Sequence, residues 1–288
     1  MTIEELKELH YDVKPCEEED LAYIQEQCGN YDNTVVPPRP EAKAEQIVRK
    51  IMGEDGSIIA GCILKILDWD TAYLDELWVD ERCRGRGMGA ALVRAVEGAA
   101  KERNCPLIYL ATHDFQGKPF YEKQGYKLCG TNENWPKGHC NHIMMKRLDS
   151  EPQQSGAADG MERFEIQAGN EADADFIDEK LGEYNSAFTP PEDPDKEIPL
   201  SRKITDAAGK LIAGIWAELD VWETAQIEGL WVEEPYRRQG FGSFLLRSVE
   251  QEAKEKGAYL ALANGYVACS TVEDMPKGHS WHVFRKAL

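Results

Sequence analysis

Two copies of one long sequence pattern make up most of the chain, and this repeat restricts its possible folds more than any other feature. The string WDTAYLDELWV at residues 69–79 recurs as WETAQIEGLWV at residues 222–232, an offset of 222 − 69 = 153. Further along, PKGH at residues 136–139 recurs at 276–279, an offset of 140. The second copy therefore lacks 153 − 140 = 13 residues, which we place opposite residues 112–124. A pattern this long that occurs only twice indicates a domain duplication rather than a solenoid.

The duplication predicts two domains of ordinary size within the 288 residues. The first predicted domain is residues 1–149, and the second, made degenerate by its deletion, is residues 162–288. Residues 150–161 lie between them and consist mainly of Ser, Gln, Gly, Ala, Pro and acidic residues. This composition is typical of a linker.

Strand-like and helix-like patterns are mixed along one copy, which predicts an α+β (layered α/β) fold built around one sheet. The predicted helices of the first copy are residues 18–28, 87–103 and 118–124, and its main predicted strands are residues 47–52, 57–67, 73–79, 107–111, 126–129 and 143–148.

The predicted strand at residues 73–79 contains an irregular step. Its apolar residues Leu74 and Leu77 are three positions apart, and the second copy repeats this step between Ile227 and Leu230. One extra residue in an alternating strand indicates a β-bulge. A bulge would splay the strand from its neighbour, so that an extended ligand with amide groups could bind to the exposed edge.

A glycine-rich loop follows this strand and leads into a predicted helix. Both copies share the pattern R-x-x-G-x-G, at Arg84–Gly89 and at Arg237–Gly242. Glycines allow successive backbone N–H groups to turn toward one point at a helix N-terminus, which predicts an anion-binding site.

At these residues the sequence resembles the GNAT acetyltransferase superfamily, whose pyrophosphate-binding loop has the pattern Q/R-x-x-G-x-G/A between a bulged strand and a helix. The string FYEKQGY at residues 120–126 is similar to the late helix-to-strand segment of that superfamily, and WPKGH at residues 135–139 is similar to the end of one bacterial branch. The resemblance covers most of residues 11–148. It implies two GNAT-like domains, each with a mixed, mostly antiparallel sheet in which the bulged strand and the next strand are splayed.

The resemblance also implies that acetyl-CoA is the co-substrate, with pantetheine along the bulged strand and pyrophosphate on the loop amides. The residues that it assigns to acetyl-CoA binding are Leu77, Trp78, Val79, Arg84, Gly85, Arg86, Gly87, Met88 and Gly89, with Arg237, Gly240 and Gly242 as further candidates in the second copy. It also implies that Tyr31, Asp32 and Asn33 line the acceptor site.

Acetyl transfer by direct attack requires a neutral amine, a polarised carbonyl and a proton for the leaving thiolate. Tyr121 matches the tyrosine that often donates this proton in the superfamily. Asp75 and Glu76 are candidates to accept the amine proton. Asp75 is preferred, because its counterpart Glu228 is also acidic whereas Glu76 corresponds to Gly229.

Composition excludes several other classes of function. A net charge of −19 argues against nucleic-acid binding, which needs basic patches. No apolar stretch is long enough to predict a membrane span. His139 and His142 have no third ligand at a motif spacing, so we predict no metal site. Eight cysteines without a CxxC pair favour free thiols in the cytoplasm.

The sequence therefore predicts an N-acetyltransferase that acts on a primary amine of a small molecule or a protein, with its active site in the first domain. The second domain lacks a counterpart of Tyr121 and is expected to be mainly structural, within a pseudo-dimeric monomer or a homodimer. Two alternatives stay open: a non-catalytic CoA-binding sensor or scaffold, and a thiol-conjugate acetyltransferase of the mycothiol-synthase type.

Overall fold

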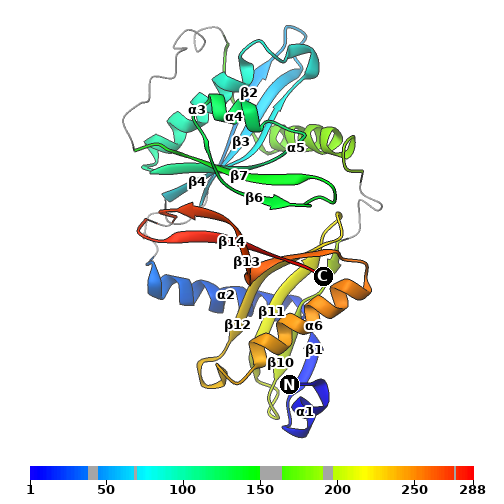
Figure 1. Cartoon of the computed structure of the whole chain (residues 1–288). Coiled ribbons are helices and arrows are strands. Elements are labelled where there is room, and N and C mark those ends of the chain that lie inside the picture. Colours follow the sequence, from blue (N-terminus) through cyan, green and yellow to red (C-terminus); the bar gives the residue numbers. More distant parts are fainter. Residues whose placement is uncertain (38–44, 68–69, 150–163, 191–196, 276) are drawn as a thin grey trace. The chain divides into compact units, whose positions relative to one another are not determined.

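The computed structural model describes residues 1–37, 45–67, 70–149, 164–190, 197–275 and 277–288, with only the backbone described for 263–267. It has the predicted α+β architecture (Figure 1). The predicted linker at residues 150–161 lies outside the described residues. No helix among those described is both long enough and apolar enough to cross a membrane.

The elements of the first repeat are α1 (Ile3–Glu8), β1 (Asp12–Pro15), α2 (Glu18–Val35), β2 (Glu45–Met52), β3 (Ile58–Leu67), β4 (Thr71–Val79), α3 (Met88–Glu102), β5 (Leu107–His113), α4 (Lys118–Lys123), β6 (Lys127–Glu133) and β7 (Cys140–Arg147). Those of the second repeat are β8 (Gln167–Ala168), α5 (Glu171–Ser186), β9 (Ile198–Pro199), β10 (Arg202–Thr205), β11 (Leu211–Leu219), β12 (Thr224–Val232), α6 (Phe241–Glu255), β13 (Leu260–Glu273) and β14 (Ser280–Ala287).

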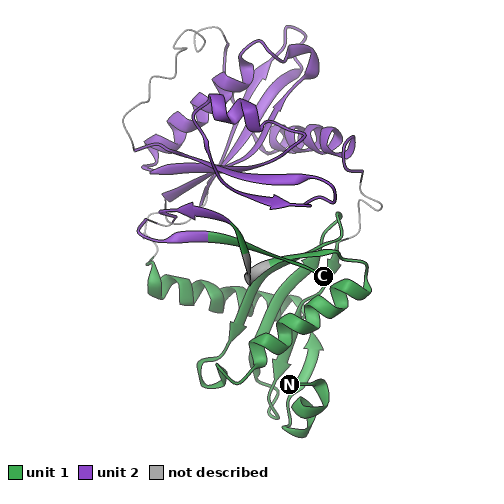
Figure 2. Ribbon diagram, in the orientation of Figure 1, with its two compact units in different colours: residues 1–37, 191–269, 282–288 green, residues 38–190, 270–281 purple. Residues whose placement is uncertain are grey.

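The chain forms two compact units, and neither coincides with residues 1–149 or 162–288 (Figure 2). Unit 1 consists of Met1–Pro37, Pro191–Cys269 and His282–Leu288, and unit 2 consists of Pro38–Pro190 and Ser270–Trp281. The long helix that begins each repeat therefore belongs to the unit that holds the main strands of the other repeat. Helix α2 packs on β11 and β12 in unit 1, and α5 packs on β3 and β4 in unit 2.

The helices α2 and α5, each of which packs on strands of the other repeat, are held in place by equivalent residues in the two units. In unit 2 the Ile177 side chain lies so close to Gly61 that a Cβ atom there would overlap it, and Ile24 lies against Gly214 in the same way in unit 1. The 153-residue offset relates both members of each contact. Glycine is thus required on the strand, because the helix approaches its backbone directly.

Ion pairs and aromatic contacts between these helices and the strands they cover are also related by the 153-residue offset. Lys50 on β2 pairs with Asp173 on α5 at 2.8 Å, and Lys203 on β10 pairs with Asp20 on α2. The rings of Trp78 and Phe176 meet edge to face at 5.8 Å in unit 2, and those of Trp231 and Tyr23 do so at 5.5 Å in unit 1.

The sheet of unit 2 has the strand order β6-β7-β5-β4-β3-β2-β8, in which β4 and β5 are parallel and the other neighbours antiparallel. Apolar residues of α3, together with Tyr121 on α4, form the core on one face of this sheet. Helix α5 covers the other face over β2–β4. Val272 and Met275 pack with Leu107, Tyr109 and Ile143 to form a smaller cluster.

The sheet of unit 1 has the order β1-β10-β11-β12-β13, with β9 beside β11 and β14 beside β13. Its core lies between the strands and α6. Strand β13 runs without a break from Leu260 to Glu273. The first repeat has β5, α4 and β6 at the corresponding place, so the described residues of unit 1 contain no counterpart of α4.

Candidate active site

The bulge predicted in β4 is confirmed by its pairing with β3. Ile63 lies opposite Glu76, whereas the next residue of β3, Leu64, lies opposite Leu74. Asp75 is therefore the extra residue. Leu74 and Leu77 consequently pack on the same face of the sheet.

The splayed pair of strands is confirmed as well. β4 is bonded to β5 only where Thr71–Tyr73 face Leu107–Tyr109. Beyond Tyr109, β5 stays paired with β7 as far as His113. The edge of β4 from residue 74 to Val79 thus has no strand beside it on the β5 side within the described chain, and its backbone groups are open to an extended ligand.

The glycine loop lies directly beyond this open edge. Arg84 folds back so that its Nε donates a hydrogen bond to the Val79 carbonyl oxygen at 3.0 Å. Gly85 and Gly87 have φ angles of 74° and 93°, in the left-handed region that favours glycine. Helix α3 begins immediately afterwards, at Met88.

These angles leave a run of backbone N–H groups unused. The amides of residues 85–89 find no acceptor in the part of the chain that the structure describes. Gly85 and Gly87 are exposed. Free amides at the positive end of a helix dipole form a site for an anion such as a diphosphate.

The two candidate carboxylates of the bulge differ in their surroundings. Asp75 is half-buried and pairs with Lys65 at 2.5 Å. Burial raises the pKa of Glu76 to about 8, and the negative charges of Asp75 and Asp178 add to this rise. The buried Oε2 of Glu76 has no hydrogen-bond partner among the described residues. Glu76 is thus a carboxyl group that exchanges protons near neutral pH.

Tyr121 lies on α4 and is only 9% exposed. Its ring meets that of Tyr126 edge to face at 5.7 Å. Burial raises the pKa of Tyr121 well above its usual value, and the charges of Cys62 and Glu76 raise it further. The hydroxyl therefore stays protonated at neutral pH, and within the described chain no hydrogen bond holds it.

Sequence reasoning missed a set of residues at the C-terminal end of α5. The Tyr184 hydroxyl donates to the Phe115 carbonyl oxygen at 2.9 Å, and the Tyr184 ring lies under the Arg84 guanidinium, 4.9 Å from its central carbon. Tyr31, expected at the acceptor site, instead lies in unit 1 under Arg237. The repeat offset could have indicated these residues, because it relates Tyr31 to Tyr184 (31 + 153 = 184).

Unit 1 has the same glycine loop as unit 2 but lacks counterparts of Glu76 and Tyr121 among its described residues. Arg237 donates from Nε to the Val232 carbonyl oxygen at 2.9 Å, and Arg238 and Gly240 have φ angles of 61° and 95°. The bulge recurs with Glu228 as its extra residue. However, Gly229 stands where unit 2 has Glu76.

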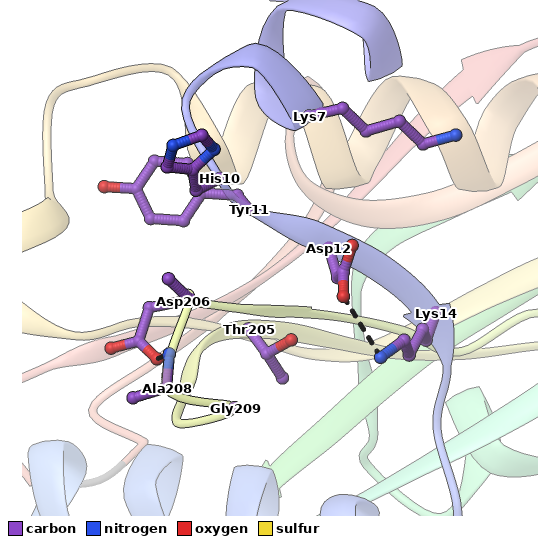
Figure 3. Close-up of a pocket in the computed structure, with 10 residues that line it drawn as sticks. Lys7, His10, Tyr11, Asp12, Lys14, Thr205, Asp206, Ala208 and Gly209 are labelled. Atoms are coloured by element: carbon purple, nitrogen blue, oxygen red, sulfur yellow. Dashed lines mark hydrogen bonds and ion pairs between the residues drawn. The ribbon is translucent and has the colours of Figure 1, made fainter.

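A separate open hollow of about 480 Å³ lies on unit 1 (Figure 3). It is lined by α1, the start of β1 and the turn after β10, and includes the ion pair between Asp12 and Lys14. None of the predicted site residues lines it. In the described chain no group of three or more His, Cys, Asp or Glu side chains is arranged to hold a metal ion.

Comparison with known proteins gives a family match in both repeats. Residues 4–126 and 166–270 match the acetyltransferase (GNAT) family. The chain is 35% identical over 97 residues to a blasticidin-S acetyltransferase from Streptomyces morookaense, covering 33% of this chain and 71% of that protein.

Solved structures give similar matches of about one repeat in length. An acetyltransferase from Bacillus cereus ATCC 14579 is 33% identical, with 46% of this chain and 95% of that chain covered and a TM-score of 0.43. An aminoglycoside 6'-N-acetyltransferase complexed with coenzyme A is 17% identical, with 49% and 99% covered and a TM-score of 0.35.

Proposed function

The chain belongs to the acetyltransferase (GNAT) family, and from that premise we propose that unit 2 transfers the acetyl group of acetyl-CoA to a primary amine of a small molecule. The observation that carries this proposal is the combination, in one unit, of a splayed strand edge, a run of free loop amides and the pair Glu76 and Tyr121. In the described part of unit 1, β12 is bonded to β13 only at Thr224–Gln226 and the amides of residues 238–242 find no acceptor, but Gly229 stands in place of Glu76 and α4 has no counterpart.

The open edge and the loop fit acetyl-CoA. The amides of residues 85–89 would bind the diphosphate, and Arg84 would add positive charge beside it. The backbone groups of residues 77–79 would pair with the amides of the pantetheine arm. Trp78 itself points to the opposite face, where it packs against Phe176.

The reaction proceeds by direct attack. An ammonium group enters and gives a proton to the Glu76 carboxylate, and the neutral amine attacks the thioester carbonyl. As the C–N bond forms, backbone N–H groups of the open edge stabilise the negative charge on oxygen. The nitrogen then loses its second proton to water, the C–S bond breaks, and Tyr121 gives its proton to the leaving thiolate.

Glu76, rather than Asp75, is the general base in this proposal. Lys65 neutralises Asp75, whereas Glu76 has a buried, unpartnered oxygen and a pKa of about 8. A base is most effective when its pKa lies near the working pH. Asp75 contributes through its charge, which helps to raise the pKa of Glu76.

The acceptor class follows from charge and from the relatives. The chain carries a net charge of −19, which favours cationic acceptors. Its relative from Streptomyces morookaense is named for blasticidin S, a small molecule. We place the reaction in the cytoplasm, in agreement with the eight cysteines, all of which are free thiols.

Thermal shift and thiol release test the proposal. Acetyl-CoA at 100 times its Kd should stabilise the protein by about 2.7 kcal/mol. Thiol release should then occur with at least one amine among blasticidin S, streptothricin, kanamycin and spermidine. Acetyl-CoA binding without thiol release from any of them would overturn the proposal and favour the sensor alternative.

The pH profile tests the base. Glu76 must be ionised to act, so kcat/KM should rise with pH to a plateau with a midpoint near 8. Glu76→Gln should lower kcat/KM at the plateau by roughly 100-fold or more and abolish this midpoint. Asp75→Asn, the matched control, should keep most of the plateau rate. The base is misassigned if Glu76→Gln retains the wild-type profile.

A further inference from the structure

The guanidinium group of Arg84 lies at the start of the glycine loop and is held on two sides. Its Nε donates to the Val79 carbonyl oxygen at 3.0 Å, and its central carbon lies 4.9 Å from the centre of the Tyr184 ring. Within the described chain its Nη atoms make no ion pair or hydrogen bond, whereas the neighbouring Arg82 pairs with Asp80 at 2.8 Å. Arg84 therefore has a fixed position and keeps its outer donors for an anion.

The Tyr184 side chain is itself held at its other end. Its hydroxyl donates to the Phe115 carbonyl oxygen at 2.9 Å. The Phe188 ring lies beside it, with centroids 5.1 Å apart, and stacks on Phe115 with centroids 4.9 Å apart and planes 9° apart. These contacts leave the half-buried Tyr184 ring little freedom to turn away from Arg84.

A further hydrogen bond fixes the end of α5, the helix of the second repeat that carries Tyr184. The Gln116 side chain donates from Nε2 to the Asn185 side-chain oxygen at 2.7 Å. The other end of the same amide accepts from the His113 backbone N–H, also at 2.7 Å. The end of α5 is thus tied to the segment that follows β5, and Tyr184 extends from there to the loop that follows β4.

The corresponding tyrosine of unit 1 lacks this anchor. Tyr31 lies under Arg237, with the guanidinium carbon 5.6 Å from the ring centre. Its side chain is 55% exposed, and its hydroxyl has no hydrogen-bond partner among the described residues. Phe115 lies within residues 112–124, which have no counterpart in the second repeat. Only the unit that holds Glu76 therefore has its loop arginine on an anchored ring.

We propose that Tyr184 of the second repeat is a positioning residue for acetyl-CoA in unit 2, because its anchored ring holds the Arg84 guanidinium where the diphosphate binds. This inference rests on the proposed function. An aromatic face attracts a cation that lies over it. A guanidinium that is already oriented also loses less conformational freedom when it binds a phosphate. Tyr184 acts through Arg84 and needs no contact with the substrate.

Tyr184→Leu tests this role, because it removes the ring and keeps an apolar side chain. With the best amine of the panel above, the KM for acetyl-CoA should rise about fivefold, as expected for the loss of one contact between a cation and a ring. The Kd of CoA, measured by calorimetry, should rise by the same factor. The kcat and the KM for the amine should stay within about twofold of the wild type, since neither depends on the diphosphate.

A double-mutant cycle with Arg84→Gln separates positioning from a general loosening of the fold. Arg84→Gln alone should raise the KM for acetyl-CoA about tenfold, because it removes a charged hydrogen-bond donor. Adding Tyr184→Leu should raise it no further, since there is no guanidinium left to position. A loss of packing would instead increase the KM in both backgrounds.

Matched variants complete the experiment. Tyr184→Phe keeps the ring beside Phe188 and should restore the KM for acetyl-CoA to within about twofold of the wild type. Tyr31→Leu makes the same change in unit 1 and should leave the kinetics of thiol release unchanged. The Tm without ligand verifies that each variant is folded, and Tyr184→Met, with the same expected result, replaces Tyr184→Leu if the latter does not fold.

The outcomes separate the two proposals. If Tyr184→Leu keeps the wild-type KM for acetyl-CoA, or raises it equally with and without Arg84, the inference about Tyr184 is wrong while continued thiol release supports the proposed function. If no amine of the panel causes thiol release, the proposed function is wrong, and the calorimetry of CoA with the same variants still decides whether Tyr184 positions Arg84. An effect of Tyr184→Leu that disappears in the Arg84→Gln background supports the inference.

Discussion

At the scale of single residues, one position separates the two units. Glu76 in unit 2 corresponds to Gly229 in unit 1, where a Cβ atom would lie 3.5 Å from the Cys28 sulfur. Burial and the Asp32 charge raise the pKa of the Cys28 thiol, so it is a poor replacement for a carboxylate base. We therefore expect unit 1 to lack a proton acceptor at its bulge.

Tyr121→Phe tests the proton donor. The change removes only the hydroxyl and leaves the ring packed against Tyr126, so the fold should be kept. Without a donor the thiolate leaves unprotonated, and kcat should fall about 100-fold while the KM for acetyl-CoA changes little. Stopped-flow measurement of thiol release provides both values.

Tyr126→Phe is the control for this variant. Its ring touches Tyr121, but the Tyr126 hydroxyl lies beside Glu97. It should keep a kcat close to that of the wild type. A Tyr121→Phe enzyme with undiminished kcat would show that another group, or water, protonates the thiolate.

At the scale of elements, the features that depend on local sequence were predictable. The three-residue step from Leu74 to Leu77 predicted the bulge, and the spacing of Arg84, Gly87 and Gly89 predicted the loop. Both follow from backbone geometry over a few residues. The position of α5 was not predictable in this way, because the sheet that a helix covers depends on contacts distant in sequence.

Charge reversal in the two loops tests whether both bind CoA. Arg84 and Arg237 make the same bond to the preceding strand, at 3.0 and 2.9 Å. Since unit 1 has free amides but no counterpart of α4, we expect calorimetry with CoA to show one tight and one weak site. Arg84→Glu should abolish the tight site, because a carboxylate repels the diphosphate, and Arg237→Glu should abolish the weak one.

The two variants serve as controls for each other, and thiol release distinguishes them further. Arg84→Glu should lose activity, whereas Arg237→Glu should retain it. A single binding site that Arg237→Glu leaves unchanged would show that the loop of unit 1 does not bind CoA. The acetyl-CoA site of unit 2 would be wrongly placed if Arg84→Glu bound CoA as the wild type does.

At the scale of the whole molecule, the sequence could predict two domains but not which helix each contains. The contacts that fasten the helices use identical residues in both repeats: Asp20 and Asp173, Ile24 and Ile177, Lys50 and Lys203, Gly61 and Gly214. The same pairs of residues would form whether each helix covered the strands of its own repeat or those of the other repeat. The repeat pattern therefore does not predict which of these two arrangements occurs. Contacts between residues that differ in the two repeats, such as the one between Gln116 and Asn185, can only form when α5 covers the strands of the first repeat.

A charge-reversal cycle tests the exchanged arrangement. Lys50 and Asp173 are mostly buried, with 16% and 13% of their side chains exposed. Lys50→Asp should destabilise the protein by roughly 2 kcal/mol, since it places two carboxylates together, and should lower Tm by several degrees. Adding Asp173→Lys should restore much of the lost stability, because the opposite charges then meet again.

The control in that cycle is Asp20→Lys, since Asp20 would be the partner of Lys50 if each repeat kept its own helix. In the exchanged structure Asp20 pairs with Lys203. Lys50→Asp combined with Asp20→Lys should therefore melt at a lower temperature than Lys50→Asp alone. Rescue by Asp20→Lys instead of Asp173→Lys would mean that α2 covers the strands of its own repeat.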